Sequence, residues 1–312
     1  MTISLLNLIR LQSIPGVGTR TLDKILEWCD HDDDRIAAFF ALDAETLKRE
    51  FTLRDNAIKA LAEVDADQAR QTLEKIESKG FRLIAAGDKD YPVQMTAILD
   101  DSAPLILYVR GDVALMQKAG VAFSGSRQVS EQGTAHAESL ARQTVDRGLT
   151  VISGGAKGVD VTAHKTALDH GGKTIVVLAE GALNFRLHAD LRDYADSDRL
   201  LVITEFAPKM TWAAGNAMVR NRTILSLARA LCVIEAGDSG GTLDAGRAAL
   251  ELGLPTFVLD YPDPPPSAVG NKLLLSEGAI PIRVADGVEL PEIPDRSEHP
   301  NSTHLSGQLP LF

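Results

Sequence analysis

Four short segments rich in glycine, serine and basic residues have the composition of an anion site. Residues 124–127 read Ser-Gly-Ser-Arg, 153–160 read Ser-Gly-Gly-Ala-Lys-Gly-Val-Asp, 220–222 read Arg-Asn-Arg, and 236–243 read Ala-Gly-Asp-Ser-Gly-Gly-Thr-Leu. Glycine lets a phosphate approach the backbone, N–H groups at a helix start donate to it, and arginine offers two parallel hydrogen bonds. Together the segments predict a composite phosphate-binding site.

A sheet must bring these segments together. From residue 81, short apolar runs alternate with helix-length amphipathic stretches, which is typical of α/β proteins. Most runs are followed by a helix pattern, which predicts right-handed crossovers, a mainly parallel sheet and helices on both faces. We predict strands at 82–86, 105–109, 121–124, 150–152, 174–178, 200–204, 230–235, 256–259 and near 280–284.

Three of the four segments follow predicted strands, at the carboxyl ends where open α/β sheets bind ligands. We expect residues 220–222 to begin an apolar helix and Asp160 to cap the helix after the second segment. Each glycine-rich turn would also suit a tight strand-to-helix connection that binds nothing. Arg220 and Arg222 would equally serve as surface charges or structural ion pairs.

No residue pattern predicts a catalytic centre, a metal site or a cofactor. We interpret His164 as a hydrogen-bonding or capping residue, because no nucleophile or second histidine lies at a suitable spacing. The chain has two cysteines, Cys29 and Cys232, which is too few for a disulfide framework or a cysteine-rich zinc site. We predict that both are buried free thiols.

Composition limits the class of protein. The 312 residues are 45% hydrophobic and 24% charged, enough for one large domain and a small one. The net charge of −11 excludes a protein that coats nucleic acid with its whole surface, so a DNA site must be a focused basic patch. Apolar runs fall far short of the roughly 20 residues of a membrane helix, and the first residues lack a signal-peptide pattern. We expect a cytoplasmic protein.

Residues 1–78 have helical periodicity, with glycine and proline confined to the Ile-Pro-Gly-Val-Gly turn at 14–18. The pattern is similar to a helix-hairpin-helix motif, in which N–H groups of Gly16, Val17 and Gly18 would contact one phosphate. A connector within a SAM-like helical bundle is the alternative, because the acidic run at 30–34 would repel phosphate. We expect a small helical domain here and an α/β domain at 79–286.

Residues 287–312 are rich in proline, acidic residues, serine and asparagine, which predicts a disordered tail. Its last five residues resemble the peptide that binds the bacterial sliding clamp of DNA polymerase. Leu311 and Phe312 would enter an apolar pocket, while Gln308 and Leu309 complete the pattern. The alternative is a tail that folds back to cover its own apolar residues.

Residues 81–284 resemble the DNA-processing protein A (DprA/Smf) family in the order and spacing of seven motifs, at 90–95, 104–111, 125–133, 153–164, 220–222, 239–243 and 270–279. The resemblance implies an extended Rossmann-like domain that forms a homodimer, binds single-stranded DNA in a basic pocket, and helps place a RecA-type recombinase on it. From the loops and the resemblance together, the candidate DNA-binding residues are Gly125, Ser126, Arg127, Ser153, Gly154, Gly155, Lys157, Gly158, Arg220, Asn221, Arg222, Ser239, Gly240, Gly241, Asn271 and Lys272.

Two departures from the family pattern matter. Asp244 follows a Ser-Gly-Gly-Thr-Leu loop where many members have Ser-Gly-Ser-Leu, which puts an acid beside the loop. The winged-helix domain often appended to the family is not expected, so no function is inferred from it.

The sequence therefore favours a non-enzymatic, single-stranded-DNA-binding recombination mediator. A nucleotide-binding or nucleotide-hydrolysing enzyme or sensor is the first alternative, with Glu235 and Asp244 as its acids. The Pro-Gly-Gly-x-Gly-Thr-x-x-Glu pattern of nucleoside-monophosphate phosphoribohydrolases is absent, and fold analogy does not fix function. The second alternative is a clamp-binding adaptor with an unused pocket, against which the collected basic residues argue.

Overall fold

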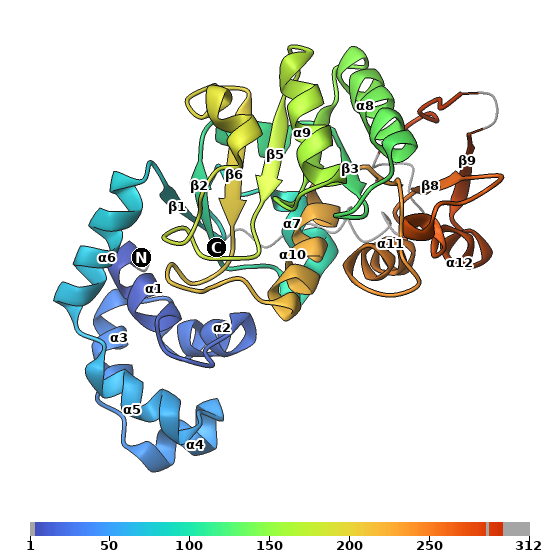
Figure 1. Ribbon diagram of the computed structural model, residues 1–312. Coiled ribbons are helices and arrows are strands. Elements are labelled where there is room, and N and C mark those ends of the chain that lie inside the picture. Colours follow the sequence, from blue (N-terminus) through green and yellow to red (C-terminus); the bar gives the residue numbers. More distant parts are fainter. Residues whose placement is uncertain (1–3, 285–286, 296–312) are drawn as a thin grey trace.

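In the computed structural model, which describes residues 4–284 and 287–295, a group of helices precedes a single nine-stranded sheet (Figure 1). The N-terminal helices are α1 Leu5–Gln12, α2 Thr19–Trp28, α3 Asp33–Phe40, α4 Ala44–Phe51, α5 Asp55–Glu63 and α6 Ala66–Ser78. Side chains of Ser4, Asp32, Asp43 and Asp65 accept hydrogen bonds from N–H groups in the first turns of their helices. These caps satisfy donors that a helix start leaves unpaired, so the local sequence fixes where the helices begin.

The predicted mixed α/β fold with a mainly parallel sheet is confirmed. The strands are β1 Arg82–Ala85, β2 Ile106–Arg110, β3 Gly120–Ser124, β4 Thr150–Ser153, β5 Thr174–Val177, β6 Leu200–Thr204, β7 Ala230–Val233, β8 Thr256–Asp260 and β9 Ile280–Arg283. Every predicted strand is present with ends within two residues. All neighbouring strands among β3 to β9 pair in parallel. Strand β1 pairs with β2, and β2 with β6, in antiparallel fashion.

The strand order is β1-β2-β6-β5-β4-β3-β7-β8-β9. Strands β3 to β6 follow one another towards one edge of the sheet and β7 to β9 towards the other, so the strand order reverses between β3 and β7. One face of the sheet carries α8 Glu131–Asp146 and α9 Val159–Asp169. The other carries α7 Val93–Leu99, α10 Ala214–Leu227, α11 Gly241–Glu251 and α12 Asn271–Ser276 (Figure 1). Crossovers that leave β3 and β7 for opposite faces create a crevice at the carboxyl ends of these two strands, where such sheets bind ligands.

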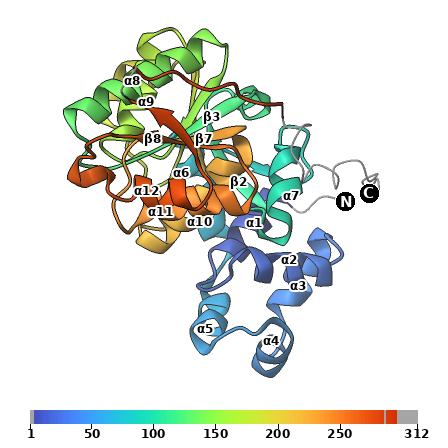
Figure 2. The ribbon, with the colours of Figure 1, turned by 90° about the vertical axis from the view of Figure 1, so that its right-hand side faces the viewer.

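Short 3-10 helices complete the structure: η1 Asp100–Ser102, η2 Val113–Gln117, η3 Ala189–Tyr194 and η4 Pro266–Ala268. The N-terminal helices extend away from the sheet and contact it through α1 and α6 (Figures 1 and 2). The Tyr108 hydroxyl, from β2, donates to Gln12 Oε1, and Gln12 Nε2 donates to the Glu205 carbonyl at 3.0 Å. Buried apolar residues continue across this contact, so the helices pack directly on the β2–β6 part of the sheet.

The start of the predicted disordered tail is ordered, which corrects the expected boundary at 286. Leu290 is buried, and its N–H donates to Gln143 Oε1 at 2.8 Å. Arg147 donates to the carbonyls of Leu290 and Pro291, and Asp295 pairs with Arg229. Composition predicted disorder because the segment is polar on average, but one buried leucine and satisfied backbone groups hold it on the domain.

Cys29 and Cys232 are both buried free thiols, as predicted. No helix in the described part of the chain is long and apolar enough to cross a membrane.

Candidate nucleic-acid interface

A cleft of about 510 Å³ opens at the reversal point of the sheet. We call it the switch-point cleft. The loops after β3, β4 and β7 and one side of α10 form its walls. Of the candidate DNA-binding residues, it brings together Gly125, Ser126, Arg127, Ser153, Gly154, Arg220, Asn221, Ser239, Gly240 and Gly241. Residues that lie far apart in the sequence therefore meet at one edge of the sheet, as the strand-end argument predicted.

A second hollow of about 370 Å³ adjoins the cleft, and we call it the side chamber. Arg127, Ala156, Trp212 and Arg220 line both hollows, and Gly155 and Lys157 line the side chamber. The residues that complete its walls are Val161, Val176, Leu178, Ala179, Glu180, Phe185, Arg186, Leu187, His188 and Leu191.

Arg127 and Trp212 stand together at the junction of the two hollows. The guanidinium carbon of Arg127 lies 5.1 Å from the centre of the Trp212 ring, within the range of a cation–π contact. Trp212 is 48% exposed, so about half of its surface remains available to a ligand. Sequence analysis missed Trp212, although an aromatic residue near basic loops is a known signal for single-strand binding.

Arg220 forms the shared floor of the cleft and the chamber. The side chain is buried, and Nη1 donates to the Val177 carbonyl at 3.3 Å. Its Nε is buried with no hydrogen-bond partner among the described residues. Burial lowers the pKa of Arg220, and the carboxylate of Asp160 opposes this shift. A buried cation with an unpaired donor beside an open cleft is suited to an anionic ligand, because an unmet buried donor is costly.

The predicted position of Arg220 and Arg222 at a helix start is wrong. Helix α10 begins at Ala214, so both residues lie in its interior. Asn216 donates to the carbonyls of Ala179 and Thr211, which helps hold the first turn in place despite weak helix formers there. Residues i and i+2 of a helix lie about 200° apart around its axis, so Arg222 lies on the opposite side of α10 from Arg220. Arg222 is exposed and lines neither hollow.

The second glycine-rich segment also differs from expectation. Gly158, not Asp160, is the N-cap of α9, with φ of +80°. A Cβ at Gly158 would lie 2.3 Å from the Ser126 carbonyl oxygen, so this glycine packs two loops together. Asp160 accepts from the Ala156 N–H at 3.2 Å. Burial raises the pKa of Asp160, and the charge of Arg220 opposes that rise.

His164 is a structural residue, as predicted. Its Nε2 lies 2.7 Å from the Gly154 carbonyl, and its Nδ1 lies 2.6 Å from Thr174 Oγ1. A carbonyl oxygen only accepts, so Nε2 carries the hydrogen. Burial lowers the pKa of His164 to about 4. This neutral side chain fixes the loop that carries Gly154.

Asn271 and Lys272 do not join the site. The Asn271 side chain accepts from the Ala236 N–H at 2.7 Å and donates both amide hydrogens, to the carbonyls of Ile234 and Leu259. Asn271 therefore holds three backbone groups of the sheet and has no hydrogen left for a phosphate. Lys272 is exposed on α12 and lines neither hollow.

Glu235, one of the acids considered for an enzyme, is fully buried. It accepts from the Ser130 N–H at 3.0 Å, from the Ser130 hydroxyl, and from the Ser267 hydroxyl at 2.6 Å. Asp244 is half-buried and lines the switch-point cleft. Glu235 thus anchors the start of α8, and Asp244 is the acid that a ligand in the cleft would meet.

The N-terminal turn is only partly available to a phosphate. The Val17 N–H donates to the Ile14 carbonyl at 3.1 Å and the Val17 side chain is buried, so its predicted phosphate contact is wrong. Gly16 and Gly18 are exposed. The turn lines a hollow of about 690 Å³ that it shares with Glu63 and Glu205, and these acids favour the connector interpretation.

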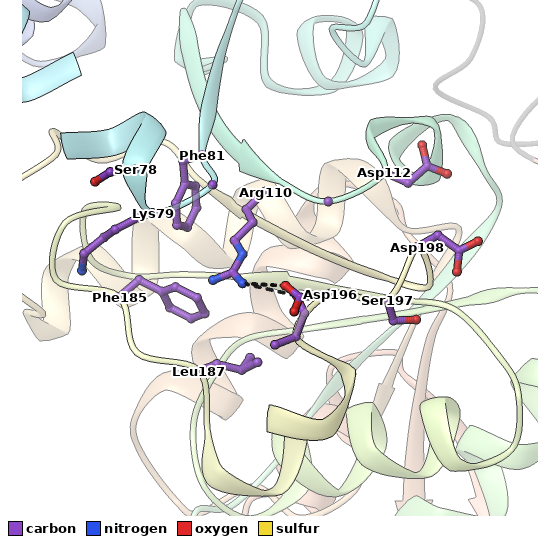
Figure 3. Close-up of a pocket in the computed structure, with 13 residues that line it drawn as sticks. Ser78, Lys79, Phe81, Arg110, Asp112, Phe185, Leu187, Asp196, Ser197 and Asp198 are labelled. Atoms are coloured by element: carbon purple, nitrogen blue, oxygen red, sulfur yellow. Dashed lines mark hydrogen bonds and ion pairs between the residues drawn. The ribbon is translucent and has the colours of Figure 1, made fainter. Parts of the chain in front are cut away.

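Another hollow, of about 880 Å³, lies beside β1 and β2 (Figure 3). Lys79 and Arg110 line it, but so do Asp112, Asp196 and Asp198. Arg110 pairs with Asp196 at 3.5 Å, so the cation is already neutralised. This hollow is a poor phosphate site, because acids outnumber bases along its wall.

The clamp-like residues Gln308, Leu309, Leu311 and Phe312 lie outside the described residues. Within the described part of the chain, no group of three or more histidine, cysteine, aspartate or glutamate residues is placed to hold a metal ion.

Residues 82–289, which contain every loop of the cleft, match the family model for DNA recombination-mediator protein A. The chain belongs to this family. Protein Smf of Escherichia coli K12 is 32% identical over 233 residues, covering 71% of this chain and 62% of that protein. DNA processing protein DprA of Streptococcus pneumoniae R6 is 35% identical over 185 residues, covering 59% of this chain and 64% of that protein. The matched region thus spans a little under two thirds of these DprA/Smf relatives.

Solved DprA structures share the fold. The X-ray structure of DprA from Streptococcus pneumoniae superposes with a TM-score of 0.74 at 26% identity, covering 93% of this chain and all of that one. A DprA structure from Helicobacter pylori, described for its unique single-stranded DNA binding mode, gives a TM-score of 0.56 at 27% identity. It covers 65% of this chain and 92% of that one.

Proposed function

We propose that this chain is a single-stranded-DNA-binding recombination mediator that helps place a RecA-type recombinase on DNA. The observation that carries the proposal is Arg220, a buried cation with an unpaired Nε, which lines a cleft formed by three glycine-rich loops. The family match and the single-stranded DNA binding described for the Helicobacter pylori relative support the choice of ligand.

The cleft offers the two kinds of contact that single-strand binding uses. Arg127, Lys157 and Arg220 supply positive charge, and the backbone at Gly240, where a Cβ would meet nothing within 4 Å, is open to phosphate oxygens. The exposed ring of Trp212 supplies a stacking surface for a base. Bases stack this way only when they are not paired within a duplex, so the arrangement favours single strands.

The test is fluorescence anisotropy with labelled single-stranded and double-stranded oligonucleotides over a salt series. Arg127→Ala should weaken single-strand binding at least about tenfold and reduce the salt dependence. Arg222→Ala removes the same charge from outside the hollows and should change affinity less than about twofold. Equal losses in both variants, or tighter binding of duplex, would contradict the proposed site.

We infer that the site binds without catalysing a reaction. Glu235 is held by hydrogen bonds from Ser130 and Ser267, and His164 is buried and neutral, so neither side chain is free to move a proton in the cleft. Incubation with nucleoside monophosphates, followed by chromatography, tests this inference. Release of free base would support the nucleotide-hydrolysing alternative.

We propose a homodimer through the β9 edge of the sheet. Strand β9 ends the strand order, and Ile280 on this strand is exposed, as are Val269 and Leu273 earlier in the chain. An exposed edge with apolar side chains pairs readily with a second copy. Ile280→Arg should shift the sedimentation coefficient towards that of a monomer. Val93→Arg changes a residue on α7 that is even more exposed and should leave the sedimentation coefficient unchanged.

We further propose that the last five residues bind the bacterial sliding clamp and that the protein acts in the cytoplasm. The pattern of Gln308, Leu309, Leu311 and Phe312 supports this partner. Surface plasmon resonance with purified clamp tests it. The double substitution of Leu311 and Phe312 by alanine should abolish binding, whereas Leu305→Ala, outside the pattern, should not.

A further inference from the structure

The side chamber is lined by apolar side chains and has a charged rim. Val176, Leu178 and Phe185 are each less than a tenth exposed and form part of its apolar wall. Lys157 and Arg186 bring positive charge to the chamber, next to the Arg127–Trp212 pair that it shares with the switch-point cleft. Its volume of about 370 Å³ lies within the range of small-ligand sites, about 300–1,000 Å³. An apolar enclosure beside phosphate-binding groups is suited to one nucleotide turned out of the bound strand.

Glu180 is the one carboxylate among the residues that line this chamber. No described residue donates a hydrogen bond to its side-chain oxygens or pairs with them. Its backbone carbonyl accepts from Thr204 Oγ1 at 2.7 Å, which fixes the main chain at this point. The carboxylate is therefore an acceptor without a hydrogen-bond donor among the described residues, and the charge of Arg220, which lines the same chamber, acts on it.

An ionised carboxylate accepts two parallel hydrogen bonds and donates none. On its pairing edge, guanine presents two adjacent donors, the ring N1–H and the exocyclic N2 amine. Adenine and cytosine each present one amine beside a ring acceptor, and thymine presents one N–H between two carbonyls. A carboxylate meets an acceptor in each of these three cases, and a buried mismatch of this kind is unfavourable.

We propose that the side chamber selects guanine, with the carboxylate of Glu180 accepting from N1–H and from the N2 amine of one nucleotide in the bound strand. The inference rests on the proposed single-strand binding, which would place that nucleotide at Arg127 and Trp212. It adds base preference to a site whose phosphate contacts read no sequence.

The experiment compares anisotropy titrations of four labelled oligonucleotides, each of thymidines with a single central dT, dA, dC or dG. The dG oligonucleotide should bind about tenfold more tightly than the all-dT one, as expected for a bidentate pair with a base edge. Replacing dG by deoxyinosine removes the N2 amine alone and should give an intermediate affinity. This substitution perturbs only the ligand, so it remains informative whatever a protein variant does to folding.

Glu180→Gln keeps the side-chain shape and should remove the dG preference, so that the variant binds the dG and all-dT oligonucleotides with equal affinity. Glu251→Gln makes the same charge change on the exposed surface of α11 and should retain the preference. Equal binding of all four oligonucleotides by the wild type, or a dG preference that survives Glu180→Gln, would overturn the proposal. If no oligonucleotide binds, the proposed single-strand binding itself fails and the guanine selectivity fails with it.

Discussion

The Nη1 atom of Arg220 lies 1.5 Å from the position that a Cβ on Gly154 would occupy. Any side chain at 154 would displace the guanidinium from the cleft floor. Gly154→Ala should therefore lower the free energy of unfolding by about 1–3 kcal/mol, the usual cost of overpacking. It should also weaken single-strand binding, because the displaced Arg220 no longer faces the ligand. Chemical denaturation and anisotropy measure the two effects.

Gly215→Ala is the matched control for this substitution. A Cβ at Gly215 meets no atom within 4 Å, and alanine is the better helix former. The control should keep wild-type affinity and equal or higher stability. Wild-type affinity in Gly154→Ala would show that Arg220 does not contribute to binding from its observed position.

The burial of His164 predicts an acid-sensitive fold. Its pKa is about 4 in the folded protein against 6.5 for an unperturbed histidine, so between these pH values the unfolded chain binds the extra proton. Stability is then lost as pH falls from 6.5 to about 4, by about 3 kcal/mol. Glu205, whose pKa burial raises to about 6, binds its proton more tightly when folded and offsets part of this loss between pH 6 and 4.5.

His164→Gln isolates the histidine contribution from that of Glu205. The variant should be less stable at pH 7, because the hydrogen bonds that His164 makes with Gly154 and Thr174 are altered. The difference in the free energy of unfolding from wild type should narrow as pH falls to about 4. Urea denaturation at a series of pH values measures this gap. A constant gap for His164→Gln would mean that this histidine does not titrate as its burial requires.

Most of the fold could be predicted from the sequence for a physical reason. Strands buried on both faces, such as β5 and β6, are almost entirely apolar, and glycine-rich loops follow β3, β4 and β7. The convergence of Gly125, Gly154 and Gly240 followed from strand ends alone. The antiparallel pairing of β2 with β6 could not be predicted, because it depends on which edge the segment reaches and not on its own periodicity.

The rest of the site depends on tertiary contacts that local patterns do not encode. Trp212 and Glu180 come from loops joined by the bond from the Gly181 N–H to the Met210 carbonyl at 2.8 Å. Nothing in the local sequence predicts that pairing. The early start of α10 likewise depends on Asn216 reaching Ala179, which overrides weak helix propensity at Gly215.

The ordered segment at 287–295 should depend on Arg147. Arg147→Met keeps the aliphatic stem and removes the hydrogen bonds to Leu290 and Pro291. A hydrogen bond of a charged group contributes about 1.5–3 kcal/mol, so local release should become at least about tenfold more frequent. Limited proteolysis after Glu289 or Glu292 should speed up accordingly. Arg142→Met removes only a surface pair with Glu138 and should leave the cleavage rate unchanged.

Glu235→Gln should act on stability and not on chemistry. The buried carboxylate accepts three hydrogen bonds, and an amide in its place turns a donor towards the Ser130 or Ser267 donors. We expect a loss of about 1–3 kcal/mol in the free energy of unfolding. Thermal and urea denaturation measure this loss. Unchanged stability together with an altered rate of mononucleotide hydrolysis would instead assign Glu235 to catalysis.

Asp244→Asn tests the acid beside the fourth glycine-rich loop. Asp244 lines the switch-point cleft near Gly240 and Gly241, so its charge opposes a phosphate bound at the start of α11. Removing one charge a few ångströms from a phosphate in a solvated site is worth about 1 kcal/mol, so single-strand affinity should rise about fivefold at low salt. The gain should shrink as salt screens the charge. Anisotropy at two salt concentrations measures it, and weaker binding by Asp244→Asn would mean that the carboxylate accepts a hydrogen bond from the strand.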